Sequence, residues 1–167
     1  MRNRLALAAA CFVAVATLAM TAAPASAKAA DHANIAFGVV RLSGAQEVGP
    51  TGQVGVGDPN GRGTFGFIAF DSKLCYFLTA RNLSATPIAA HIHAAPRGVN
   101  GAIVIALQTP DDGFSADCID AQQADTPNDM TVLTQTELNG IIADPAGFYA
   151  NVHTGDFPAG AIRGQLK

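Results

Sequence analysis

Apolar and polar residues alternate along much of the chain after residue 35, which is the period of β-strands whose two faces meet different surroundings. The clearest case is GTFGFIAF (63–70), in which Phe65, Phe67 and Ala69 share one face. The same kind of pattern predicts further strands at AFGVVRL, KLCYFLTARNL, AAHIHAA, AIVIAL, FYANVHT and AIRGQL (36–42, 73–83, 89–95, 102–107, 148–154 and 161–166).

The segments between these strands are rich in turn-forming residues. Residues 43–63 hold seven glycines and two prolines, so the backbone must turn repeatedly there. Residues 108–129 are rich in Asp, Gln and Pro, and they predict a long acidic loop that Cys118 tethers.

One helix is predicted, from about Thr134 to Asp144. Thr134 and Glu137 have the spacing of a capping box, and an apolar stripe follows at Leu138, Ile141 and Ile142. Pro145 ends the pattern, because the residue before proline avoids the helical region. Many short strands with one short helix predict an all-β fold, an antiparallel sandwich or barrel.

The first 27 residues have the composition of a secretory signal peptide. Arg2 and Arg4 precede an apolar run over residues 5–20, and Ala25-Ser26-Ala27 is a small-x-small cleavage site. We therefore expect cleavage near Ala27, an extracytoplasmic location and no retained membrane anchor. The expected organisation is a signal peptide (1–27), a flexible leader (28–36) and a single domain (37–167).

Charge and cysteine count narrow the function classes. The chain has ten basic and thirteen acidic residues, which gives a formal net charge of −3. Cleavage removes Arg2 and Arg4, so eight basic residues remain and the net charge becomes −5. An acidic domain without a basic stripe disfavours nucleic acid and anionic membrane surfaces as partners. Cys75 and Cys118 remain after cleavage, and in an exported protein they predict a disulfide, with free thiols as the weaker alternative.

The pair His91 and His93 is the main candidate for chemistry. Residues i and i+2 of a strand share a face, so both imidazoles can converge on one point. If the strand that carries His153 is a neighbour, three histidines meet, and three imidazoles with an open position suit zinc or copper. The alternatives are that the histidines brace turns by hydrogen bonding, or that one serves as a general acid or base.

Five further polar residues are candidates for the surroundings of this cluster: Glu47, Tyr149, Asn151, Arg163 and Gln165. Tyr149 and Asn151 share a strand face with His153, and Arg163 and Gln165 share a face of the last strand. Glu47 is a candidate to orient a ligand histidine or to act as a base, but the favoured interpretation is a buried ion pair with Arg163.

Three blocks, LSGAQEV, AAHIHAAPRGVNGAIVIAL and DPAGFYANVHTGDFPAGAIRGQL, together resemble the CHRD domain, which is named for its repeats in chordin. The resemblance covers about residue 37 to the C-terminus, with mild departures at Gly49 and Asp144. It implies an immunoglobulin-like β-sandwich or barrel in an extracytoplasmic protein, and it implies no settled activity.

Three hypotheses about function follow. The first is a non-enzymatic secreted module with a binding or structural role, whose partner is a protein or a small-molecule ligand. The second is copper or zinc binding, or a metal-dependent enzyme, at His91, His93 and His153. The third is a metal-free enzyme that acts on a small organic substrate in the same polar pocket.

Overall fold

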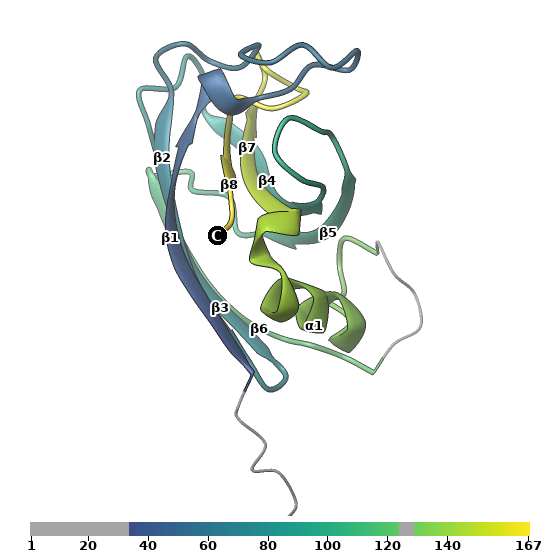
Figure 1. Cartoon of the computed structure of the whole chain (residues 1–167). Helices are drawn as coiled ribbons and strands as arrows, with labels where there is room; N and C mark the ends of the chain where they lie inside the picture. The colour runs from purple at the N-terminus through teal and green to yellow at the C-terminus, as the bar shows by residue number, and fades with distance from the viewer. Residues whose placement is uncertain (1–33, 124–128) are drawn as a thin grey trace, which may run out of the picture. The chain divides into compact units, whose positions relative to one another are not determined.

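The computed structural model describes residues 34–123 and 129–167 as an antiparallel β-sheet with one α-helix (Figure 1). The strands are β1 (Ile35–Ser43), β2 (Arg62–Phe70), β3 (Lys73–Arg81), β4 (Pro87–Ala94), β5 (Ala102–Leu107), β6 (Phe114–Asp120), β7 (Phe148–Thr154) and β8 (Ile162–Gln165). The helix α1 spans Gln135–Ala143, and short 3-10 turns, η1 and η2, cover Gly44–Gln46 and Pro145–Gly147.

The predicted signal peptide lies outside the described residues, as does most of the predicted leader. β1 already includes Ile35 and Ala36, the last two residues of that leader. Among the helices of the described part, none is long and apolar enough to cross a membrane.

The eight strands form one sheet in the order β5-β4-β7-β8-β1-β2-β3-β6, and every pairing is antiparallel. The predicted all-β class with one short helix is confirmed, in a nearly closed, barrel-like form. β8 and β1 are joined through a single residue pair, Ser43 and Arg163. The sheet therefore has two four-stranded halves, which curve around a shared core in Figure 1.

The two edge strands approach each other through side chains. The hydroxyl of Tyr76 on β3 accepts a hydrogen bond from the backbone N–H of Gln108, just after β5, at 2.7 Å. The hydroxyl of Ser115 on β6 donates to the carbonyl of the same Gln108, also at 2.7 Å. These two bonds satisfy the backbone N–H and carbonyl of Gln108, which no neighbouring strand pairs with at this point.

The core follows the predicted alternation. Phe67 and Leu78 are buried, whereas their chain neighbours Ile68 and Phe77 are exposed. Helix α1 begins with the expected capping box and places Leu138 and Ile141 in the core. Burial of these side chains stabilises the domain at roughly 25 cal/mol for each Å² of apolar surface removed from water.

The prediction of a loop over residues 108–129 is wrong for Phe114–Asp120, because these residues form strand β6. β6 pairs with β3 along its whole length, and Cys118 stands directly opposite Cys75. The predicted Cys75–Cys118 disulfide is confirmed. The FSADCID sequence carries little apolar signal because β6 is an edge strand with mostly exposed side chains, so the ladder and the disulfide, not burial, hold it.

Candidate functional site

The strands β4 and β7 are neighbours, and this places all three candidate histidines on one face of the sheet. In the register of the pair, His91 lies opposite Asn151, His93 opposite Tyr149, and His153 opposite Ala89. His153 is therefore diagonal to His91. The alternate residues Ala90, Ile92, Ala150 and Val152 point to the apolar core on the other face.

The three imidazoles are close enough to share one ion. One ligand nitrogen from each of His91, His93 and His153 lies within 4.8 Å of the others. Nδ1 of His91 is 3.1 Å from Nε2 of His153. Nitrogens bound to one tetrahedral zinc at about 2.0–2.1 Å are about 3.3 Å apart, so the observed cluster needs only a modest contraction around a metal.

Two of the rings are oriented by loop carbonyls. Nδ1 of His93 lies 3.0 Å from the carbonyl of Gly101, and Nδ1 of His153 lies 3.0 Å from the carbonyl of Pro158. A carbonyl only accepts, so both Nδ1 atoms carry the proton and both Nε2 atoms are acceptors. Nε2 of His153 accepts from Nδ1 of His91. Nε2 of His93 is buried and has no hydrogen-bond partner.

All three histidines are held in the neutral form. Burial, together with His153 and His93 nearby, lowers the pKa of His91 to about 4. Burial also lowers the pKa of His93 and of His153, although the carbonyls of Gly101 and Pro158 oppose this shift. Neutral imidazole is the form that binds a metal, so no proton has to be displaced near pH 7.

Next to the cluster lies a buried polar layer built around Tyr149. The ring of His93 stacks on the Tyr149 ring, with centroids 4.7 Å apart and planes 3° apart. The guanidinium carbon of Arg163 lies 3.3 Å from the centre of the same ring. The layer is buried because loops from residues 44–61 and 95–101 cover this face: Asn100 joins them by donating to the carbonyls of Val48 and Gly49.

The expected Glu47–Arg163 ion pair is a wrong prediction. Within the described ranges the ion pair found is Lys73–Asp120, and Arg163 instead donates to the carbonyls of Pro96 and Val99 and to the side-chain oxygens of Asn100 and Gln165. The hydrogen bonds of the guanidinium therefore go to neutral oxygens, and Arg163 acts on Glu47 only through its charge.

Glu47 is buried, and its Oε1 has no hydrogen-bond partner. Burial raises the pKa of Glu47 to about 7, although the nearby charge of Arg163 and the backbone N–H of Val48 lower it. Gly160 packs against this carboxyl at φ +139, and a Cβ there would lie 2.6 Å from the Glu47 carboxyl atoms. Glycine alone leaves room for the acid.

The other candidates have clear contacts. Gln165 donates to the carbonyls of Ala95 and Phe148, and it therefore braces the loop that follows β4. Oδ1 of Asn151 is buried and has no hydrogen-bond partner; Asn151 stands opposite His91 on β4 and opposite Arg163 on β8. The structure thus gathers His91, His93, His153, Tyr149, Asn151, Arg163, Gln165 and Glu47 on one face of β4, β7 and β8 and under its loops.

Sequence patterns did not indicate the carbonyls of Gly101 and Pro158, which orient the rings, or the side chain of Asn100, which joins the covering loops. Their only signal is position, since each lies in a loop that directly follows or precedes a histidine-bearing strand.

The comparison with curated proteins found no match, and neither did the comparison with solved structures. A family model described as "CHRD domain" matches residues 39–166, which include both halves of the sheet and every residue of the histidine cluster. The chain therefore belongs to the CHRD-domain family.

Proposed function

We propose that this CHRD domain is an extracytoplasmic metal-binding module that holds one copper or zinc ion at His91, His93 and His153. The observation that carries the proposal is the orientation of the rings: loop carbonyls engage Nδ1 of His93 and of His153, and their Nε2 atoms are left as acceptors. Metal-bound histidines in proteins characteristically donate their second N–H to such a carbonyl, which fixes the tautomer and the ring.

The surroundings support the proposal. Asn151 leaves a buried amide oxygen without a partner beside the rings, and Tyr149 packs flat against His93. Three neutral imidazoles with an open position suit zinc and copper, whereas hard oxygen-loving cations such as calcium do not favour them. The N-terminal signal-like segment and the Cys75–Cys118 disulfide support an oxidising, extracytoplasmic setting.

The test is metal stoichiometry of the exported protein, purified without an affinity tag, stripped with a chelator and then titrated with Cu²⁺ and Zn²⁺. We expect one equivalent to bind, as measured by elemental mass spectrometry and calorimetry. His93→Ala and His153→Ala should each lose it. His32→Ala, which removes the fourth histidine of the chain, is the matched control and should retain it.

Circular dichroism of each variant separates a lost ligand from a lost fold. If a folded His93→Ala protein binds the metal as tightly as the wild type, the proposal is wrong. If the wild type binds no metal at micromolar concentration, and the variants unfold, the histidines serve as loop braces through Gly101 and Pro158.

A further inference from the structure

The outer face of β1, β2 and β3 belongs to the half of the sheet that does not carry the histidine cluster. This face has an apolar zone and a cationic zone. Strand register aligns the side chains in rows across the three strands. One row holds Val39, Gly66 and Phe77, and the next holds Phe37, Ile68 and Cys75. The rows lie about 7 Å apart, since neighbouring residues on one face are two positions apart along a strand.

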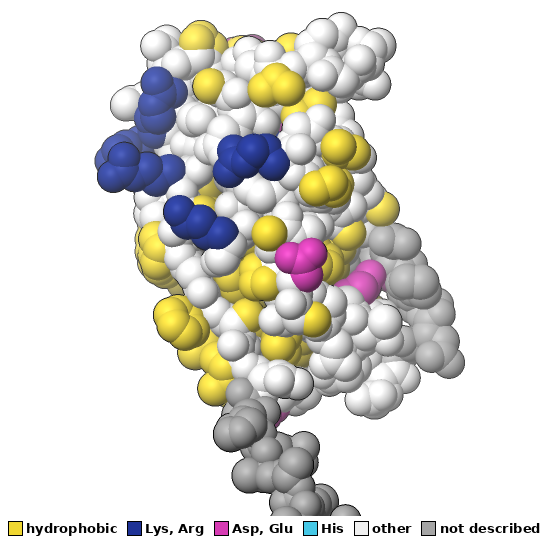
Figure 2. Space-filling view, viewed as in Figure 1, with side chains coloured by type: hydrophobic (Ala, Val, Ile, Leu, Met, Phe, Trp, Pro, Cys, Tyr) yellow, Lys and Arg dark blue, Asp and Glu magenta, His cyan; other side chains and the backbone are white. Residues whose placement is uncertain are grey.

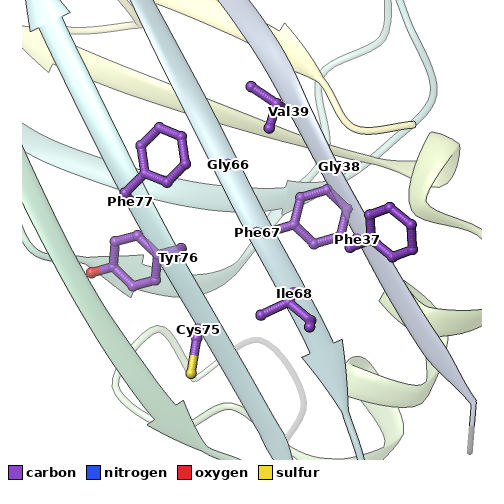
Figure 3. Close-up of a pocket in the computed structure, with 9 residues that line it drawn as sticks. All are labelled: Phe37, Gly38, Val39, Gly66, Phe67, Ile68, Cys75, Tyr76 and Phe77. Atoms are coloured by element: carbon purple, nitrogen blue, oxygen red, sulfur yellow. The ribbon is translucent and has the colours of Figure 1, made fainter.

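These two rows form an exposed apolar surface. The side chain of Phe37 is 73 % exposed and that of Val39 is 60 % exposed. Figure 3 shows Val39, Ile68 and Phe77 around Gly66, and these residues line a shallow hollow of about 490 Å³ on β1, β2 and β3. A Cβ on Gly66 would lie 2.1 Å from the Phe77 ring, so the glycine lets this ring lie low across the sheet. Apolar surface of this kind on a soluble domain usually marks an interaction site.

The adjacent end of the same face is cationic. Arg41, Arg62 and Arg81 are exposed there, and the last two stand directly opposite each other on β2 and β3. Like charges in directly opposed positions destabilise a sheet. Among the described residues no carboxylate forms an ion pair with any of the three. Figure 2 shows Lys and Arg side chains gathered at the upper left, with hydrophobic side chains below them and acidic ones elsewhere.

We propose that this face docks the domain onto an anionic lipid bilayer, with the two apolar rows inserted at the headgroup boundary and the three arginines on lipid phosphates. Without residues 1–27 the formal net charge is −5, and a charge of this sign spread evenly over the surface would disfavour such a membrane. Folding gathers Arg41, Arg62 and Arg81 at one end of the face, however, and a membrane interacts with this local field within a Debye length of about 8–10 Å.

A bilayer fits the arrangement better than a protein partner does. The apolar rows and the arginine zone lie on one continuous sheet face, so a bilayer against this face would meet the apolar side chains and the arginines together. Arg62 is held by the carbonyls of Pro59 and Gly61, which fix its charge at the cationic end of the face, one row beyond Arg41. Such docking is peripheral and needs no membrane-spanning segment.

The test is co-sedimentation of the exported protein with vesicles of phosphatidylcholine alone or mixed with phosphatidylglycerol, in the presence of a chelator so that the result is independent of metal. Intact mass first confirms that residues 1–27 are absent. We expect binding to the anionic vesicles only, with an affinity that falls as salt rises.

Two variants probe the two zones. Arg41→Gln/Arg62→Gln/Arg81→Gln should weaken binding at least about tenfold. Thermal unfolding confirms that this variant is folded, because Arg62→Gln removes the bonds to Pro59 and Gly61 as well as a like-charge pair. Phe37→Ser should also weaken binding about tenfold, since an inserted ring is lost. Arg97→Gln and Ile88→Ser are the matched controls, because both residues are exposed outside this face, and neither should change binding.

The proposal is overturned if the wild type does not bind anionic vesicles, or if the triple arginine variant binds them as the wild type does. It is also overturned if analytical ultracentrifugation shows a dimer that Phe37→Ser dissociates, since the face then belongs to a second copy.

Discussion

The guanidinium of Arg163 lies flat over the ring of Tyr149, 3.3 Å from its centre, and both side chains are buried. The partners of Arg163 are loop carbonyls and amide oxygens, and its plane is stacked on an aromatic ring. Arginine suits this position because its planar fork can donate several hydrogen bonds while its face packs on a π-system.

Arg163→Lys is expected to destabilise the domain by about 2–4 kcal/mol, because an ammonium group cannot keep the stacking and the spread of donors together. Urea unfolding followed by circular dichroism measures the loss. Arg97→Lys, at an exposed position, is the control and should change the unfolding free energy by less than about 0.5 kcal/mol. Equal effects at both positions would contradict the assigned role of Arg163.

Glu47→Gln is expected to change how stability depends on pH. Burial raises the pKa of Glu47 to about 7 in the folded protein, from 4.5. Between these values the folded state holds a proton that the unfolded chain releases, so the wild type loses stability as pH rises, by up to about 3 kcal/mol. The variant has no such loss and should be the more stable protein at pH 8. Parallel stability curves for the two proteins from pH 4.5 to 8 would show that Glu47 does not titrate in this window.

The histidines act in the opposite direction in the metal-free protein. The pKa of His91 is lowered to about 4 from 6.5, so between these values the unfolded chain binds protons that the folded state excludes. We expect stability to fall as pH drops from 6.5 toward 4, and His91→Gln to reduce that slope. Thermal unfolding of both proteins across this range measures it, and an unchanged slope would mean that His91 is not held neutral by the fold.

Removal of the disulfide by Cys75→Ser/Cys118→Ser is expected to cost about 3–4 kcal/mol, since it closes a loop with a sequence separation of 43. Because Cys118 lies in the edge strand β6, hydrogen exchange of β6 amides should accelerate more than that of β2 amides. Uniform acceleration across the sheet would indicate that the disulfide stabilises only through the unfolded chain.

Thr134→Ala is expected to lower stability by about 1 kcal/mol, because the Thr134 hydroxyl accepts from the backbone N–H of Glu137 at 3.1 Å and caps α1. Thr134→Ser keeps the oxygen and should restore most of the loss. Thermal unfolding compares the three proteins, and if the serine variant is as unstable as the alanine variant, the loss comes from packing of the methyl group.

The strands with strong alternation could be predicted with nearly their observed bounds, and so could the helix with its cap, because period and capping chemistry act over a few neighbouring residues. The same local rule placed His91 and His93 on one face. β6 escaped prediction because an exposed edge strand carries little hydrophobic signal. The pairing of Arg163 was mispredicted because opposite charge suggested Glu47, whereas the carbonyls that bind it belong to a distant loop.

The sequence by itself determined the all-β class, the disulfide and the residue types of the candidate site, because each depends on local periodicity or on a small number of reactive side chains. The tertiary structure alone decided that His153 lies beside His91, and that Arg41, Arg62 and Arg81 form one cationic zone. Strand order and register set these neighbours, and they follow from packing of the whole sheet around its core.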